Sequence, residues 1–427
     1  MKRYEAYDSF LDIWVDEIPA HWETHKMKYL FHERSEKGYP DEPLLVASQN
    51  MGVVPKNVYG NRTVEAQKDL HLLKLVRVGD FVISLRSFQG GLEYAYYQGI
   101  ISPAYTVLTP HEPITAGYFR YLAKSKLFIG LLTLCVTGIR EGQNIDYEKL
   151  RNHFLPVPPR EEQDQIVRYL DWQVSKINRL IAAKRKEVEL YKEQMCKVFS
   201  VSSSENQKVR LKRVCDLVFQ PVDIRPDAMY CKTGMYNRGR GIFRREPMLG
   251  CELGDSMFQH IDRNHVMISG QFAWEGAAYV TSEADEEGIV SHRYYLLKPT
   301  RLTPEYIWAY LMSDKGLLEM LICSHGSAGR NRPLNIEELL NTYIPLPNSE
   351  ADEKRVISAV RALMYIYRQK ERVFQLYEQL RTRLISDVVT GQVDVRGIEV
   401  PEYEYVAEVI ESDENNAEVL EESKEAD

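Results

Sequence analysis

Residues 145–158 read IDYEKLRNHFLPVP, and residues 334–347 read LNIEELLNTYIPLP, with Glu, Leu, Asn and both Pro residues in matching places. Four more pairs of stretches repeat in the same order, and all offsets lie between 184 and 189 residues. They are HKMKYLF at 25–31 with VRLKRVC at 209–215, FVISLRSFQGG at 81–91 with VMISGQFAWEG at 266–276, GIISPAYTVLTP at 99–110 with GIVSHRYYLLKP at 288–299, and LYKEQMCKVFS at 190–200 with LYEQLRTRLIS at 376–386. Because this spacing is far longer than a solenoid period, the chain contains two copies of a whole domain with its connector.

The first part of each copy mixes strand and helix patterns. Short apolar runs rich in β-branched residues, FVISL at 81–85 and VMIS at 266–269, lead into Gly-containing loops and predict strands. Helices are predicted for AGYFRYLAKSKLFIGLL at 116–132 and for PEYIWAYLMSDKGLLEML at 304–321. Each copy is therefore expected to contain a globular α+β domain.

The second part of each copy begins with a proline-rich segment and continues as a long helix. Acidic residues follow the prolines in both copies, which is a signal for a helix N-terminus. Apolar residues then recur at alternating spacings of four and three, as in a coiled-coil seam. The predicted seam residues are Leu170, Val174, Ile177 and Ile181 in the first copy, and Val360, Leu363, Phe374 and Tyr377 in the second.

Two seams in one chain predict that the two helices pair as an antiparallel coiled coil. Each seam carries a Lys at the same position, Lys184 and Lys370, which either fixes the register or extends its charge to solvent. A helix of roughly 35 residues is about 50 Å long, comparable with one or two turns of B-DNA. The predicted fold class is thus α+β, with two tandem mixed α/β domains separated by two long helices.

The expected domain boundaries follow the repeat. The first α+β domain spans 1–155, the first helix 156–205, the second α+β domain 206–346, the second helix 347–396, and an acidic tail 397–427. From Pro401 to Asp427 the tail holds eleven acidic residues and one Lys, and we expect it to be disordered. Residues 1–400 carry a net charge of +2, although the whole chain carries −8. A nucleic-acid role must therefore depend on local basic patches.

Motifs favour a binding protein over an enzyme. The chain has no P-loop, no dinucleotide-binding glycine motif, and no tetrapeptide or acidic pattern typical of amino-methyltransferases or nucleases. Six scattered cysteines and the isolated pair His21 and His25 complete no ligand set, so no metal site is expected. No apolar run approaches the length of a membrane span, and the first residues lack a signal-peptide core, so we expect a cytoplasmic protein.

The sequence resembles the specificity subunits of type I DNA restriction-modification systems over residues 11–396. The stretches that carry the resemblance are IPAHW at 18–22, GIISPAYTVLTP and its repeat, GIREGQNIDYEKLRNHFLPVPPREEQDQIVRYLD at 138–171, and LRTRLISDVVTGQVDV at 380–395. The second copy departs from the pattern at Asn348–Lys354, which replaces the PREEQ of the first copy. We expect this change to alter a contact with a partner subunit. The acidic tail is additional to the family pattern.

The resemblance implies two target-recognition domains, each reading one half of a bipartite, asymmetric DNA site. It implies that the two helices set the gap between the half-sites and dock two adenine methyltransferase subunits. Two translocase/nuclease subunits would complete the restriction enzyme. S-adenosylmethionine, ATP and Mg would belong to these partners, with no cofactor in this chain, so the chain alone is expected to be non-catalytic.

Candidate DNA-binding residues lie where the two copies diverge. Arg suits guanine and Gln suits adenine in the major groove, while arginines beside glycines suit phosphates. The candidates are Arg86, Gln89, Arg140, Gln143 and Asn144 in the first copy, and Asn237, Arg238, Arg240, Arg244, Arg245, Gln271, Trp274, Arg330, Asn331 and Arg332 in the second. The alternative for each is a solvated loop residue, or for Trp274 a core residue or stacking wall.

Two other functions stay open at this point. A coiled-coil adaptor that joins two protein ligands would show a flat salt response, whereas binding through several phosphates weakens by roughly one power of salt concentration per contact. A stand-alone nuclease or methyltransferase with degenerate motifs would modify DNA without partners when S-adenosylmethionine is supplied.

Overall fold

The computed structural model describes residues 2–49, 51–59, 69–84, 87–137, 144–254, 256–326 and 332–406. The chain divides into two compact units. Unit 1 comprises Met1–Ile181 and Gln375–Ile410, and unit 2 comprises Ala182–Phe374 and Glu411–Asp427. Each unit therefore combines one α+β body with part of each long helix, and the predicted domain boundaries stay a prediction.

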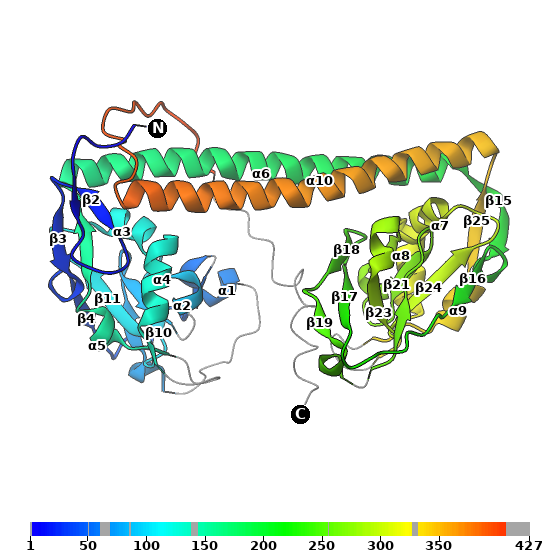
Figure 1. Cartoon of the computed structure of the whole chain (residues 1–427), viewed down its shortest axis with the longest axis horizontal. Helices are drawn as coiled ribbons and strands as arrows, with labels where there is room; N and C mark the ends of the chain where they lie inside the picture. The colour runs from blue at the N-terminus through cyan, green and yellow to red at the C-terminus, as the bar shows by residue number, and fades with distance from the viewer. Residues whose placement is uncertain are drawn as a thin grey trace. The chain divides into compact units, whose positions relative to one another are not determined.

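Unit 1 is built around a four-stranded antiparallel sheet in the order β4-β11-β8-β9 (Figure 1). Its strands are β1 (Tyr7–Ser9), β2 (Glu17–Pro19), β3 (Glu23–Lys26), β4 (Phe31–Arg34), β5 (Leu45–Ser48), β6 (Gly52–Pro55), β7 (Lys74–Val76), β8 (Phe81–Ile83), β9 (Glu93–Tyr94), β10 (Gly99–Ile101), β11 (Thr106–Pro110), β12 (Val136–Thr137), β13 (Asn144–Ile145) and β14 (Phe154–Val157). Its short helices are α1 (Lys56–Tyr59), α2 (Ser87–Gly90), α3 (Ala116–Leu122), α4 (Lys126–Leu134) and α5 (Tyr147–Leu150).

Unit 2 repeats this sheet in the order β16-β24-β21-β22 and adds a second sheet around β17 and β23. Its strands are β15 (Ser203–Arg210), β16 (Cys215–Val218), β17 (Met229–Tyr236), β18 (Gly241–Arg244), β19 (Met248–Leu249), β20 (Phe258–His260), β21 (Val266–Ser269), β22 (Ala278–Val280), β23 (Gly288–Ser291), β24 (Tyr294–Pro299) and β25 (Tyr343–Pro347). Its helices are α7 (Pro304–Leu311), α8 (Asp314–Ile322) and α9 (Ile336–Asn341). The central strands β8 and β11 of this sheet, and their counterparts β21 and β24, lie in stretches that repeat in the sequence, so the predicted duplication is confirmed.

Local sequence explains where the short helices begin. The Thr115 hydroxyl accepts a hydrogen bond from the N–H of Tyr118 at 3.2 Å, and the Ser125 hydroxyl accepts one from the N–H of Phe128 at 3.3 Å. Caps of this kind stabilise a helix by about 1 kcal/mol. In unit 2, Pro304 occupies the first turn of α7, where its fixed φ suits the helix and its missing N–H has no cost.

Aromatic side chains join the sheet of unit 1 to its helices. Phe31 and Phe81 lie on the sheet, and both contact Phe119 of α3 with ring centroids 4.5 and 4.8 Å apart. Phe119 in turn contacts Phe128 of α4 at 5.6 Å. All four side chains are at most 3% exposed, so they form the centre of the unit 1 core.

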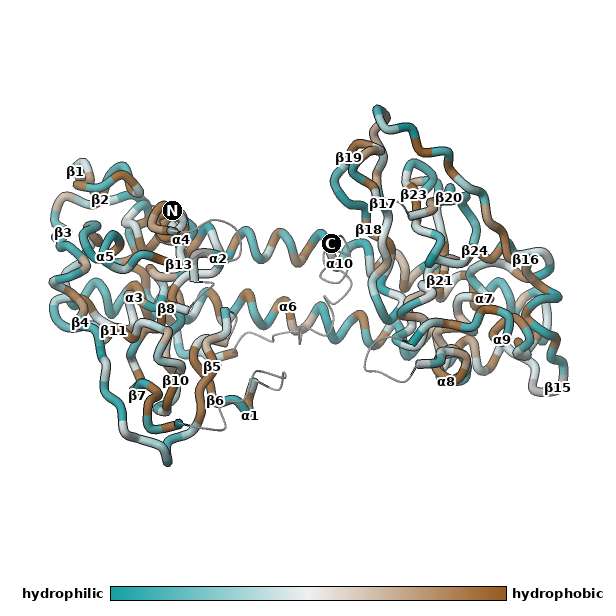
Figure 2. Tube along the Cα trace, turned by 90° about the horizontal axis from the view of Figure 1, so that it is seen from below, coloured by the Kyte–Doolittle hydropathy of each residue, from teal (hydrophilic) through white to brown (hydrophobic). Residues whose placement is uncertain are grey.

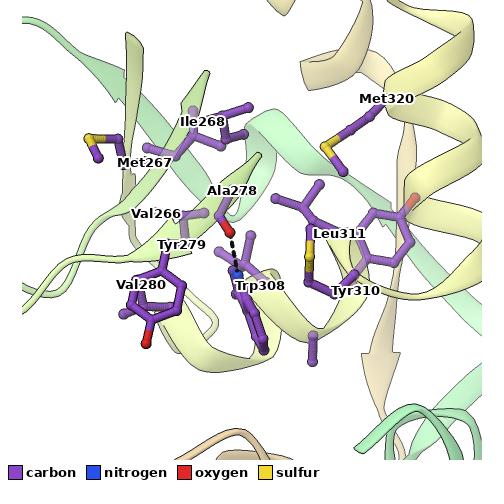
Figure 3. Close-up of a cluster of buried hydrophobic side chains, with 14 of the residues drawn as sticks. Val266, Met267, Ile268, Ala278, Tyr279, Val280, Trp308, Tyr310, Leu311 and Met320 are labelled. Atoms are coloured by element: carbon purple, nitrogen blue, oxygen red, sulfur yellow. Dashed lines mark hydrogen bonds between the residues drawn. The ribbon is translucent and has the colours of Figure 1, made fainter. Parts of the chain in front are cut away.

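Trp308 of α7 lies in the core of unit 2 (Figure 3). Its ring is 1% exposed, and its Nε1–H donates to the carbonyl oxygen of Ala278 at 2.7 Å. Tyr279 packs edge-on against the same ring with centroids 6.0 Å apart. The indole thus fills the core and also satisfies the buried carbonyl of Ala278 at the start of β22.

Two long helices, α6 (Arg160–Ser202) and α10 (Glu350–Val389), contribute to both units. In unit 1, the start of α6 packs against the end of α10, with Leu170 in one buried cluster with Leu384 and Val388. In unit 2, the end of α6 packs against the start of α10, with Met195 in one buried cluster with Val360. Both pairings are antiparallel, as predicted, and brown apolar residues recur along α6 among teal polar ones in Figure 2. The predicted fold class is confirmed.

The seam residues differ in burial. Leu170, Ile177, Ile181, Val360 and Leu363 are buried, while Val174, Phe374 and Tyr377 are partly exposed. The two seam lysines contact their own helices, because Lys184 pairs with Glu187 at 2.6 Å and the Lys370 ammonium lies 5.0 Å from the Phe374 ring. These contacts agree with seam lysines that extend along the helix surface.

We expect Trp308→Phe to lower the free energy of unfolding of unit 2 by about 1–3 kcal/mol, because the Ala278 carbonyl loses its donor in a buried site. Guanidinium denaturation followed by circular dichroism measures the change. Trp172→Phe, on a partly exposed side chain of α6, is the matched control and should change stability by less than about 0.5 kcal/mol. Equal effects of the two substitutions would contradict this role of the indole N–H.

Candidate nucleic-acid interface

A tight turn between β17 and β18 presents the most basic stretch of unit 2. Arg238 has a φ of 60° and Gly239 a φ of 66°, both in the left-handed region. The N–H groups of these two residues donate to the carbonyl oxygens of Glu275 and Gly276 at 3.0 and 2.8 Å. The turn is therefore fixed on the Ala273–Glu275 segment, and the exposed Arg238 guanidinium is held at its tip.

Asn237 supports this turn from inside. Its side chain is 4% exposed, and its amide donates to the Glu275 carboxylate. The structure therefore gives Asn237 a buried structural contact, and its predicted DNA contact stays a prediction. The buried contact forms because Glu275, which follows the strand β21 in the chain, turns its carboxylate under the loop.

Three other arginines of the stretch have different surroundings. The Nε–H of Arg240 donates to the Asn237 carbonyl at 3.0 Å, and its guanidinium lies over the Tyr236 ring. Arg244 pairs with the exposed carboxylate of Glu287 at 2.7 Å. Arg245 is half-buried, and its backbone N–H donates to the carbonyl of Lys232 at 2.9 Å. Since exposed ion pairs contribute little to stability, Arg244 can exchange its partner for a phosphate at small cost.

Gln271, Trp274 and Arg332 meet beside this turn although they come from two separate stretches of sequence. The Trp274 Nε1–H donates to the Gln271 carbonyl at 3.1 Å, and the Arg332 guanidinium lies 5.3 Å from the centre of the Trp274 ring. A hydrogen bond of 2.7 Å from the N–H of Leu334 to the carbonyl of Gly270 joins the two segments. All three side chains are partly exposed, so they form a stacked, polar-edged surface.

In unit 1, the corresponding stretches also come together. Gln89 is exposed on α2, a short helix where the sequence predicted the end of a strand. Helix α2 contacts β13, which carries the exposed Asn144. The candidates Arg86, Arg140, Gln143, Arg330 and Asn331 lie outside the described residues. No finding tests the predicted DNA contacts themselves, which stay predictions.

Sequence reasoning missed the group that holds α2 in place. The Lys124 ammonium donates to the carbonyls of Gln49 and Gly90 at 3.0 and 2.8 Å and to the Glu93 carboxylate at 2.8 Å. Glu93 is fully buried, and this burial raises the pKa of its carboxyl to about 7, against the lowering effect of Lys124. Its only signal in the sequence was a carboxylate between apolar residues just after Gly90 and Gly91.

Other groups in the described residues show no sign of metal chemistry or membrane insertion. The imidazole of His21 contacts the buried Glu162 carboxylate at 2.7 Å, beside the indole of Trp22. Within the described ranges, no three His, Cys, Asp or Glu side chains are grouped so as to hold a metal ion. In that same part of the chain, no helix has the length and apolar character to cross a membrane.

Comparison with known proteins found no matching family model. The chain is 23% identical over 303 residues to the "Type I restriction enzyme MjaVIII specificity subunit" of Methanocaldococcus jannaschii. That match covers 61% of this chain and 66% of the relative.

Two solved structures are also similar to this chain. A chain described under complex assembly and conformational transition of the type I R-M system has a TM-score of 0.55 at 14% identity, covering 88% of this chain and 99% of that one. The HsdS subunit from Thermoanaerobacter tengcongensis has a TM-score of 0.40 at 16% identity, covering 88% of this chain and 98% of that one. The resemblance to type I specificity subunits inferred from the sequence is confirmed, and the first of these structures shows the same fold.

We expect Glu93→Gln to abolish a pH dependence of stability in unit 1. The folded state holds the Glu93 proton up to about pH 7, above the usual value of 4.5, so wild-type unfolding free energy falls as pH rises through this window. The loss amounts to at most about 3 kcal/mol. Urea denaturation at pH 5 and pH 8 measures it, with the exposed Glu112→Gln as a control that keeps the wild-type profile. If the Glu93→Gln variant keeps the wild-type dependence of stability on pH, the buried Glu93 carboxyl is not its source.

Proposed function

We propose that this chain is the DNA-sequence-specificity subunit of a type I restriction-modification complex. Each unit binds one half of a bipartite, asymmetric DNA site, and α6 and α10 set the gap between the halves. The main support is the duplicated sheet, which carries divergent polar loops at the same place in each copy. The related specificity subunit of Methanocaldococcus jannaschii supports the same assignment.

The contacts of unit 2 suggest a division of labour among its polar residues. Arg238, exposed at the tip of a rigid turn, suits a phosphate, because a guanidinium forms short, charge-assisted bonds to phosphate oxygens. Gln271 suits an adenine, since its amide N–H can donate to adenine N7 and its amide oxygen can accept from the adenine N6 amino group in the major groove. The Trp274–Arg332 stack forms a wall beside that position.

The chemistry is proposed to lie with partner subunits. Two methyltransferase subunits dock on the long helices and use S-adenosylmethionine, and two translocase/nuclease subunits use ATP and Mg. This chain is non-catalytic alone and needs no cofactor of its own. The cytoplasmic location stays a prediction.

We expect Arg238→Gly to weaken DNA binding similarly for all sequences and to reduce the salt slope by about 0.9, the value for one phosphate contact. Gly keeps the left-handed backbone of the turn, so the variant removes the charge alone. Fluorescence anisotropy of DNA bound by the chain with its methyltransferase partner, at salt concentrations from about 50 to 200 mM, measures the slope. Arg301→Gly, at another exposed arginine of unit 2, should leave it unchanged. A slope equal to wild type in Arg238→Gly would remove this residue from the interface.

We expect Gln271→Ala to relax one base position in one half of the target, costing about 1–3 kcal/mol of discrimination there. Gln89→Ala, on unit 1 at the position that matches Trp274 in the repeat, should relax a position in the other half only. Genome-wide mapping of methyladenine in cells that carry each variant reads both halves at once. If no split motif depends on the wild-type gene, the proposed function is wrong. If both variants relax positions in the same half of the motif, the assignment of one unit to each half is wrong.

A further inference from the structure

In unit 1, the chain beyond α10 lies along the first part of α6 (orange-red in Figure 1). We name residues 399–406 the C-terminal strap. The Ser175 hydroxyl donates to the Glu404 carbonyl at 3.1 Å and accepts from the N–H of Val406 at 2.7 Å. The Asn178 amide donates to the Val406 carbonyl at 3.0 Å, and Arg179 donates to the Glu404 carbonyl at 3.3 Å. The strap is thus held mainly through its backbone.

The strap also contributes two tyrosines, Tyr403 and Tyr405, next to a partly buried ion pair. Arg120 of α3 donates to the Asp171 carboxylate of α6 at 2.6 Å. Burial raises the pKa of Tyr403, and the nearby Asp171 carboxylate raises it further. The surface of unit 1 formed by α3 and α6 therefore binds an extended segment that is acidic and rich in tyrosine, with the sequence PEYEYV at 401–406.

Unit 2 has an equivalent surface between α7 and α10. In unit 1, the N–H of Thr115 donates to the Gln163 side chain at 2.8 Å, and in unit 2 the N–H of Thr303 donates to the Glu353 side chain at 3.0 Å. Glu353 lies 190 residues after Gln163. The fully buried pair Leu170 and Val360 has the same spacing of 190 residues, so this register relates the first turns of the two long helices.

By this register, the residues that bind the strap have different counterparts in unit 2. Asp171, Ser175 and Asn178 correspond to Arg361, Tyr365 and Arg368. The carboxylate and the two small polar groups of α6 are therefore replaced on α10 by two guanidinium groups and a phenol. An acidic partner segment gains more binding free energy on this surface than on the unit 1 surface, because each guanidinium offers several donors to carboxylates and carbonyls.

This surface of unit 2 is a hollow of about 590 Å³, lined by Arg263, Glu305, Arg361, Tyr365 and Arg368 among others. The Tyr365 side chain is 61% exposed, which is unusual for a large aromatic residue. Arg361 pairs with Glu305 at 2.8 Å but is 71% exposed, and Arg263 lies 3.7 Å or more from its acidic neighbours. The Arg263 pairs are loose and solvated, so they can reorganise around an acidic ligand at small cost. Arg361 keeps its contact with the nearly buried Glu305 and offers its exposed remaining donors.

We propose that this hollow in unit 2 binds an extended acidic, tyrosine-containing segment of a partner protein, of the chemistry that the C-terminal strap has in unit 1. The segment lies along α10 with its backbone carbonyls facing Arg361 and Arg368, and its carboxylates pair with Arg263. Its aromatic side chain packs on Tyr365. The proposal concerns a protein contact and does not depend on which DNA the chain reads.

The test uses a synthetic peptide with the strap sequence EVPEYEYV and measures binding stoichiometry by isothermal titration calorimetry. The full chain should bind one peptide, because its own strap occupies the unit 1 surface. A chain ending at Val400 should bind two, because both surfaces are then open. Binding of one peptide by the truncated chain and none by the full chain would overturn the proposal, as would no binding by either.

Substitutions in the full chain locate the peptide. Arg263→Glu and Tyr365→Ser change exposed side chains and should each weaken the affinity by roughly five- to tenfold, or about 1 kcal/mol or slightly more. Ser175→Ala, on the occupied unit 1 surface, is the control and should leave it unchanged. Unchanged affinity in both unit 2 variants would overturn the proposal. So would a concentration-dependent dimer in sedimentation that the truncated chain lacks, since the occupant would then be the strap of a second copy.

Discussion

The antiparallel packing of α6 against α10 is the contact on which both units depend. Leu170 and Val360 are fully buried, each in a cluster that includes residues of the other long helix and of the α+β body. Each such side chain contributes about 1.5–3 kcal/mol when removed from water. Unit 2 takes both of its helix segments from the continuous stretch Ala182–Phe374, whereas unit 1 is completed by Gln375–Ile410, a segment far in sequence from Met1–Ile181.

This arrangement brings the N-terminal segment and the end of α10 into the same unit. The Tyr118 hydroxyl donates to the carbonyl of Val389, 271 residues away, at 2.7 Å, and the N–H of Asp394 donates to the carbonyl of Lys2. Contacts this distant in sequence form late, because closing long loops costs conformational entropy before the contacts are gained. Unit 1 therefore completes its core only when the last part of α10 is available.

The two units keep one frame but fix their polar loops by different chemistry. In unit 1, the Lys124 ammonium ties two loop carbonyls to a buried carboxylate. In unit 2, a turn with left-handed residues rests on the segment after β21, and a cation–π contact joins Arg332 to Trp274. Duplicated domains with a shared sheet and differently anchored loops can present different side chains to the two halves of one asymmetric target, which agrees with the proposed function.

The sequence by itself determined the duplication, the α+β class, the two long antiparallel helices and the stretches where the copies diverge. These features depend on local signals: the repeated order of motifs, the spacing of apolar residues and the prolines before acidic helix starts. Only the tertiary structure decided that Asn237 is buried beneath a turn, that Glu93 is paired with Lys124, and that the strap lies on α6 while the matching surface of α10 lines a hollow among the described residues. Each of these depends on which residues far apart in the chain become neighbours, and on how burial changes the cost of their charges, which no local pattern encodes.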